Sequence, residues 1–189
     1  MTALESYLCT YFNIPSKYLD VLSRKFVYRT LPKGEYFTRS GAYCEKLSFI
    51  KSGHLRIFEY EEGKDITQWI SSKGELVTDL SSLFFHTPAR RNIQALTDCE
   101  LFTIEKESYR QLANIVPQWP ELEKLFIAKC FLTLEDRVFG FLSLSAEQRF
   151  QQIFQYKKEL FNEVPLHYLA SMMGMSAETL SRIRNNGIS

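Results

Sequence analysis

Short segments rich in β-branched and aromatic residues fill the first half of the chain. Five glycines, at positions 34, 41, 53, 63 and 74, separate them at intervals of seven to twelve residues. This spacing is typical of a β-sandwich or barrel. The candidate strands are residues 25–30, 46–51, 54–60, 65–70, 91–96 and 100–105. Residues 61–65, EEGKD, predict a hairpin turn, and roughly the first twenty residues predict one or two short helices packed on the barrel.

A different period begins after Glu105. Pro117 and Pro120 open a segment that predicts a long helix from about 120 to 142. Its apolar residues step by four, three, four and three, which is the a/d pattern of a helix seam. The seam residues are Ile127, Phe131, Leu134, Val138 and Phe141. The seam either packs on the chain's own barrel or pairs with a second copy, and we favour the second copy.

The last 45 or so residues predict a separate group of short helices. Ser145 and Gln148 match a capping box, so a helix begins there. A further helix begins near Pro165 and ends at Gly174, where a left-handed residue is favourable. Ser176 is then placed to cap a last helix over 177–185.

The last helix carries a polar face opposite a buried one. Leu180 and Ile183 are expected to point inward. The opposite side carries Glu178, Ser181, Arg182 and Asn185. An arginine can fork to guanine, a glutamate can accept from cytosine and an asparagine can bind adenine, so this face could read a DNA major groove. The alternative is that Glu178 and Arg182 form an ordinary i, i+4 surface ion pair.

Composition narrows the possible classes of protein. The chain has 189 residues, 45% of them hydrophobic, and a formal net charge of +1. No apolar run approaches the roughly 20 residues of a membrane span, and no signal-peptide pattern opens the chain, so we expect a soluble cytoplasmic protein without a membrane partner. The four cysteines and three histidines are widely dispersed, so we expect free thiols, no metal site, no cofactor and no catalysis.

Two segments together resemble the Crp/Fnr family of bacterial transcription regulators. Residues 164–184 resemble its helix-turn-helix, with Ala170 in the small interhelical position, Gly174 in the turn and SAETLSRI at 176–183. Residues 31–76 resemble its β-roll effector domain. The resemblance implies an α+β fold with a jelly-roll sensor domain at 1–116, a dimerisation helix at 117–142 and a helix-turn-helix DNA-binding domain at 143–189. No β-wing is expected after the last helix.

The resemblance also implies partners and contact residues. The partners are double-stranded DNA, a second copy of the chain, an unidentified small-molecule effector and RNA polymerase. The family's base-contacting positions fall on Ala177, Glu178 and Arg182, with Ser176 and Thr179 towards phosphate. Ala177 replaces the arginine common there, so part of the operator sequence should differ. With Ser181 and Asn185 these residues form the predicted DNA-binding set.

The effector is not expected to be cAMP or cGMP. In members that bind cyclic nucleotides, a GE(L) motif supplies a carboxylate for the ribose, and the candidate here is Gly74, Glu75 and Leu76. The phosphate arginine does not align, because counting back from Ile93 places Ala89 at its position. Arg90 and Arg91 are the nearest cations and remain candidates for the effector pocket.

One other function stays open at this point. A sensor of this kind could bind a partner protein through its C-terminal helices and never touch DNA. The near-neutral charge of residues 143–189 favours that alternative. This segment has five basic and four acidic residues, and weak basicity limits non-specific DNA binding.

Overall fold

The computed structural model describes residues 1–187 and divides the chain into two compact units. The first unit contains Met1–Ile57 and Ser71–Cys130, and the second contains Phe58–Ile70 and Phe131–Ser189. The predicted domain boundaries near 116 and 142 remain predictions. The end of the predicted DNA-binding domain, residues 188–189, lies outside the described residues.

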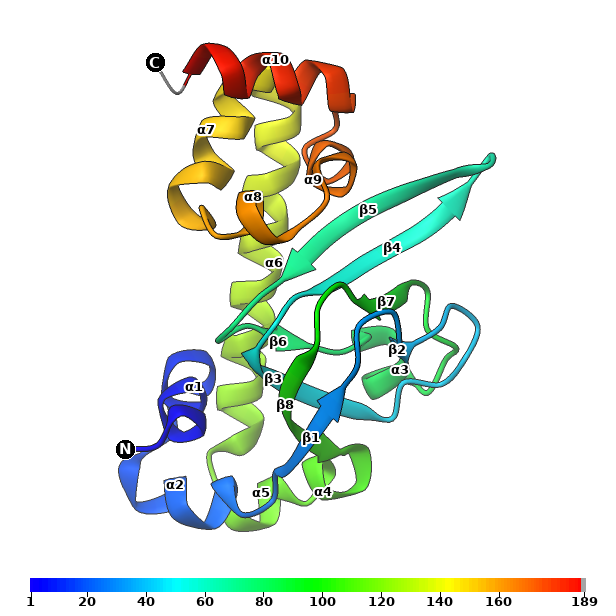
Figure 1. Ribbon diagram of the computed structural model, residues 1–189. Helices are drawn as coiled ribbons and strands as arrows, with labels where there is room; N and C mark the ends of the chain where they lie inside the picture. The colour runs from blue at the N-terminus through cyan, green and yellow to red at the C-terminus, as the bar shows by residue number, and fades with distance from the viewer. Residues whose placement is uncertain (188–189) are drawn as a thin grey trace. The chain divides into compact units, whose positions relative to one another are not determined.

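Two four-stranded antiparallel sheets form the β-structure (Figure 1). One sheet has the order β1-β8-β3-β6 and the other β2-β7-β4-β5. The strands are β1 (Val27–Leu31), β2 (Tyr36–Thr38), β3 (Lys46–Ser52), β4 (Leu55–Glu61), β5 (Lys64–Ser71), β6 (Leu76–Val77), β7 (Asn92–Ala95) and β8 (Cys99–Glu105). All six strands expected from the sequence are present. The two that the sequence did not predict, β2 and β6, are too short for an alternating pattern to stand out.

The N-terminal helices pack on the first sheet. These are α1 (Ala3–Phe12) and α2 (Ser16–Ser23). Thr2 and Glu5 form a capping box at the start of α1. Leu8 and Phe12 of α1 share a buried core with Phe49 of β3 and Phe126. The ring centroids of Phe12 and Phe126 lie 4.7 Å apart. The predicted packing of short helices on the barrel is therefore confirmed.

Three short helices and one long helix complete this part of the fold. They are α3 (Leu80–Phe85), α4 (Lys106–Arg110), α5 (Leu112–Ile115) and α6 (Trp119–Ser143). The prediction of a long helix over 120–142 is confirmed almost to the residue. The three short helices α3, α4 and α5 were not expected from the sequence.

The second unit combines a hairpin with the C-terminal helices (Figure 1). The turn of the β4–β5 hairpin holds Glu62 at φ 50° and Gly63 at φ 77°, as the EEGKD motif predicts. The helices are α7 (Ala146–Tyr156), α8 (Leu160–Glu163), α9 (Leu166–Met172) and α10 (Ala177–Gly187). The hairpin is fixed to α9 by the amide of Thr67, which donates to Ser171 Oγ at 2.9 Å.

Within residues 1–187 no helix combines the length and the apolar character that crossing a membrane requires.

Candidate functional site

A glycine fixes the turn between α9 and α10. Gly174 has φ +65°, and a Cβ placed on it would approach the ring of Phe141 to 2.9 Å. The amide of Met175 donates back to the carbonyl of Ala170 at 3.0 Å and closes the end of α9. Both the backbone angle and the close ring therefore require glycine at this position.

Arg149 of α7 holds the same turn from the other side. Its guanidinium donates to the carbonyls of Met173 at 2.9 Å, Leu144 at 2.7 Å and Gly174 at 3.5 Å. The bonds to Met173 and Gly174 satisfy carbonyls that the end of α9 leaves without helix partners, and the bond to Leu144 ties the turn to the segment between α6 and α7. Sequence reasoning did not find this role, because Arg149 lies 25 residues before Gly174 and shares no motif with it.

The start of α10 is capped as the sequence predicts. Ser176 Oγ accepts from the amide of Thr179 at 3.2 Å and donates to Thr179 Oγ1. The pKa of the Glu178 carboxyl is lowered because it accepts from its own backbone amide and, to a smaller extent, from Ser176. Glu178 is therefore a charged acceptor at neutral pH beside the Ser176 hydroxyl group.

The outer face of α10 gathers most of the predicted contact residues. Ala177, Glu178, Ser181, Arg182 and Asn185 line one shallow hollow. On the opposite side Leu180 is fully buried and Ile183 nearly so, which anchors the helix as predicted. Across residues 1–187, no ion pair joins Glu178 to Arg182, so the alternative of an i, i+4 pair is not realised. These polar groups are available to bind something outside the chain.

The predicted seam on α6 divides into three kinds of environment. Ile127 packs partly against the core of the first unit, as the alternative of self-packing would have it. Phe131, Leu134 and Val138 are exposed by 63%, 53% and 52%. Phe141 lies beside Gly174 and under the guanidinium of Arg149. An apolar stripe is therefore left open in the middle of the predicted seam.

The interior of the β-roll is filled by apolar side chains. Leu55, Val77, Ile93 and Leu101 are among the residues of this buried cluster. Ala89, at the position of the phosphate arginine by alignment, belongs to the same cluster and is 3% exposed. The backbone of Ala89 is bonded to Gly41 and Ala42, which fixes the loop around it.

The predicted effector residues do not converge on this interior. The carboxylate of Glu75 accepts from the amide of Ser72 within a turn, and Leu76 packs against the core shared with α1. The amide of Gly74 donates to Ile50 O in the same turn. On the following loop Arg90 is exposed, and the guanidinium of Arg91 donates to the carbonyl of Arg90.

The carboxylate that precedes the short helix α3 is Asp79, which sequence reasoning missed. Asp79 accepts from the amide of Ser82 at 2.8 Å and from the amide of Arg90 at 3.0 Å. It therefore caps α3 and ties it to the loop that carries Arg90. Thr78–Leu80, a TDL tripeptide at the start of a helix, is a variant of the GE(L) motif. Gly74–Leu76 matches that motif letter for letter and was therefore chosen from the sequence.

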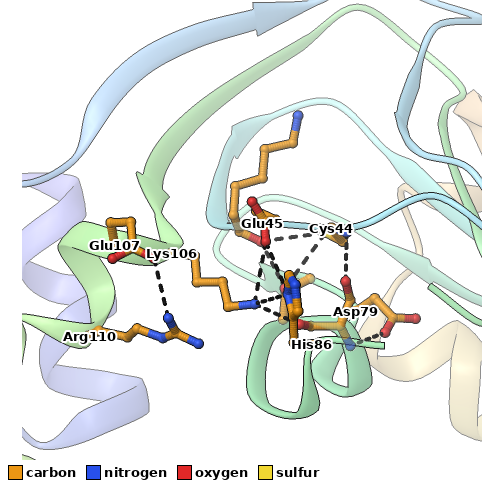
Figure 2. Close-up of polar contacts among 10 residues, drawn as sticks. Cys44, Glu45, Asp79, His86, Lys106, Glu107 and Arg110 are labelled. Carbon is orange, nitrogen blue, oxygen red and sulfur yellow. Dashed lines mark hydrogen bonds and ion pairs between the residues drawn. The ribbon is translucent and has the colours of Figure 1, made fainter. Parts of the chain in front are cut away.

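A buried lysine fixes the far end of α3 (Figure 2). The Lys106 side chain is 4% exposed, and its Nζ donates to Ser82 O at 3.2 Å, lies 3.5 Å from Glu45 Oε1 and contacts His86 Nδ1 at 3.1 Å. Because Asp79, Lys106 and Glu45 already satisfy these groups, α3 is held as a structural element. In the described part of the chain no three histidine, cysteine or acidic side chains form a group that could hold a metal ion.

Comparisons with known proteins agree with this geometry. Residues 28–115 match the family model of the cyclic nucleotide-binding domain. A search of curated proteins gives no match. Among solved structures, FixK2 from Bradyrhizobium japonicum aligns with a TM-score of 0.71 and 15% identity over 85% of this chain and 83% of its own.

Two other kinds of neighbour are informative. The c-di-GMP responsive global regulator CLP from Xanthomonas campestris aligns with a TM-score of 0.64 and 20% identity over 91% of each chain. The regulatory domain of Toxoplasma gondii PKA with cAMP aligns with a TM-score of 0.55 and 17% identity over 63% of this chain. This chain spans 46% of that PKA structure and 39% of a second one.

At these identities the likeness establishes the fold alone. The region that matches the cyclic nucleotide-binding domain, residues 28–115, contains nearly all of the two antiparallel sheets, which is consistent with the expected jelly roll.

Proposed function

We propose that this protein is a DNA-binding transcription regulator of the Crp/Fnr type. The proposal combines the match of residues 28–115 to the cyclic nucleotide-binding domain with the polar outer face of α10. The observation that carries the proposal is the outer face of α10. Glu178 and Arg182 on this face form no ion pair within residues 1–187, while the inner face is anchored by buried Leu180. A helix held this way presents hydrogen-bonding groups at a fixed angle to a groove.

Each residue on this face has a distinct role in the proposal. Arg182 forks to guanine, Glu178 accepts from cytosine N4 and Asn185 pairs with adenine. Ser176 and Thr179, at the positive end of the helix, bind phosphate and set the register. Ala177 offers only a methyl group, so the base opposite it is read through apolar contact.

The regulator acts as a homodimer. The exposed Phe131, Leu134 and Val138 provide the apolar stripe for a second copy. Two copies of α10 then enter successive major grooves about 34 Å apart, which requires a palindromic site. RNA polymerase is the partner through which such a regulator would act on transcription.

The β-roll responds to an effector other than cAMP or cGMP. A cyclic phosphodiester needs a guanidinium and helix-terminal amides for its charge. Here Ala89 occupies the relevant position in an apolar cluster, and the Ser82 amide of α3 is already bonded to Asp79.

The test of DNA reading begins with selection of a preferred site from random duplexes. Arg182→Ala should weaken binding to that site by roughly 1 to 3 kcal/mol and relax the preference at one base pair in each half-site. Thr179→Ala should weaken binding to all sequences alike, and Thr179→Ser should restore it. If Arg182→Ala leaves the ranking of mismatched sites unchanged, Arg182 does not read bases. If no duplex binds with salt-dependent affinity, the partner-protein alternative replaces the proposal.

The effector proposal is tested by titration calorimetry with both cyclic nucleotides at millimolar concentration. No saturable heat is expected. Saturable binding that Arg90→Ala removes would mean that the loop arginines rebuild the phosphate site.

A further inference from the structure

A cavity lies inside the second unit, apart from the β-roll interior and from the outer face of α10. It has a volume of about 330 Å³, which is within the range of small-molecule sites. Its apolar wall is formed by Trp69 of β5, Phe141 of α6, Ile153 and Tyr156 of α7, Met172 of α9, and Met173, which follows α9 directly. Four elements of the unit therefore meet around one space.

Two arginines line this cavity without carboxylate partners. Arg137 lies over the ring of Trp69 at 4.7 Å and over Phe141 at 5.3 Å, and its Nη2 donates to Met172 O at 2.8 Å. Arg149 lies over Phe141 at 5.4 Å and binds backbone carbonyls. In the described residues no ion pair reaches either guanidinium, although Asp136 also lines the cavity.

The charge of Arg137 is held in a poorly hydrated place. Burial lowers its pKa to about 10, so it stays protonated at neutral pH but lacks much of the water that would stabilise it. A single carbonyl bond leaves most of the donors of a guanidinium free for an anion. An anion that entered the cavity would therefore meet a preformed, partly desolvated cation between aromatic rings.

The exposed apolar stripe on α6, formed by Phe131, Leu134 and Val138, lies on a different side of the helix from the cavity. At about 100° per residue, Thr133, Arg137 and Gly140 are centred roughly 120° around the helix from Phe131, Leu134 and Val138. A second copy that pairs through the stripe would leave the cavity side uncovered. The occupant is thus a molecule small enough to fit between β5, α6, α7 and α9.

We propose that this cavity binds a small organic anion with a flat aromatic or apolar body. The rings and methionines of the wall take the body, and Arg137 takes the anionic group. Because Met172 ends α9 and Met173 follows it directly, the bound molecule would tie α9 to α6 and so act on the helix that leads into α10. The proposal does not depend on DNA binding.

The probe for the test is 1-anilinonaphthalene-8-sulfonate, a flat aromatic sulfonate, and its neutral counterpart is N-phenyl-1-naphthylamine. The chain has two tryptophans, Trp69 in the cavity wall and Trp119 in the core of the first unit. The sulfonate should bind saturably, one per chain, with energy transfer from tryptophan that falls further in Trp69→Phe than in Trp119→Phe, because Trp69 contacts the bound molecule.

Three further variants separate the charge from the space. Arg137→Gln should weaken binding of the sulfonate about tenfold or more and binding of the neutral amine less than threefold, since only the sulfonate loses a charge-assisted bond. Arg24→Gln changes the net charge equally at an exposed site and should change neither. Gly140→Leu should block both probes, whereas Gly140→Ala should bind both, because its Cβ would meet no atom closer than 3.6 Å.

The thermal unfolding of each variant is recorded beside its titration, so that loss of fold is not mistaken for loss of binding. Sulfonate binding that is indifferent to both Arg137→Gln and Gly140→Leu overturns the proposal, as does a folded parent protein that binds neither probe. A chain that binds the probes but no DNA would sink the proposed function and leave this site standing.

Discussion

The interior of the β-roll and the cavity of the second unit are both lined by apolar side chains. They differ because the cavity also has two arginines in its wall, whereas the buried cluster of the roll, among residues 1–187, has no charged member. In the roll, buried apolar side chains form one cluster, in which Ala89, Ile93 and Val77 are almost fully buried. In the second unit, helices and a hairpin leave a space of about 330 Å³ that has Arg137 and Arg149 at its wall.

The difference shows where a charged ligand can be accommodated. A cation enclosed in a close-packed roll costs several kcal/mol unless an anion always accompanies it. A guanidinium at the wall of a partly open cavity keeps a carbonyl bond and ring contacts, so it is tolerated while the site is empty. On the two proposals above, this chain binds an anion in the cavity of the second unit and not in the roll.

The largest expected effect comes from placing a charge in the roll. Ala89→Arg should lower the free energy of unfolding by at least about 4 kcal/mol, because it buries an unpaired guanidinium in a filled space. Ala113→Arg, at an exposed helix position, should change it by less than about 0.5 kcal/mol. Urea unfolding measures both. A stable Ala89→Arg protein that gains cAMP binding would remove the contrast between the two regions.

The second test compares the packing of the two regions directly. Ile93→Ala should cost about 2 to 5 kcal/mol, since it leaves a void among fully buried neighbours. Ile153→Ala should cost less than about 1.5 kcal/mol, because Ile153 is only half-buried and already borders a space. Equal losses in chemical denaturation would mean that the cavity closes in solution.

A third test asks whether pairing through α6 leaves the cavity open. Leu134→Asp should weaken dimer association by roughly 2 kcal/mol or more in analytical ultracentrifugation, because it places charges in an apolar seam. Leu132→Asp is the matched control, since Leu132 is 55% exposed but lies off the seam. Both variants should bind the sulfonate probe like the parent. A parent protein that is monomeric at micromolar concentration, with or without DNA, contradicts the dimer.

The smallest effect concerns Glu75, which lies near the N-terminal helix. Burial, and then the charge of Glu75, raise the pKa of Tyr11 to about 12. Unfolded tyrosine ionises near pH 10, so this group stabilises the fold fully below pH 10 and progressively less as the pH rises to 12.

Glu75→Gln should lower the pKa of Tyr11 but leave it above 10, since burial is the larger cause. Titration of the Tyr11 Cζ signal by NMR, assigned with Tyr11→Phe, measures the change. An unchanged Tyr11 pKa would mean that the charge of Glu75 does not act on Tyr11. It would weaken the structural role assigned to Glu75 and favour a role in ligand binding.

Local signals in the sequence predicted their structures well. The capping box of Ser145 and Gln148 forms with both hydrogen bonds, and Gly174 takes the left-handed conformation. These features depend on backbone groups within a few residues, so composition at fixed offsets is sufficient to predict them. The alignment that put Ala89 in place of a cation also agrees with its burial.

Longer-range features were harder to predict. The sequence contains a literal GEL motif at Gly74–Leu76, and this motif does not identify Asp79 as the helix cap. Only the folded chain shows which carboxylate precedes a helix. Lys106 and Glu45 form an ion pair although they lie 61 positions apart in the sequence, and no local pattern in either segment predicts this pair. The seam was predicted as one continuous stripe, but Ile127 is partly covered by its own unit and Phe141 faces the turn at Gly174.

By itself the sequence determined the six longer strands, the long helix, the starts of the last helices and the polar face of α10, because periodicity and capping act over one or two turns of chain. Only the tertiary structure decided that Arg137 and Arg149 share a wall with Trp69 and that α10 is held through the carbonyls of its turn. Those arrangements join residues from four elements, and the position of each depends on how all the others pack.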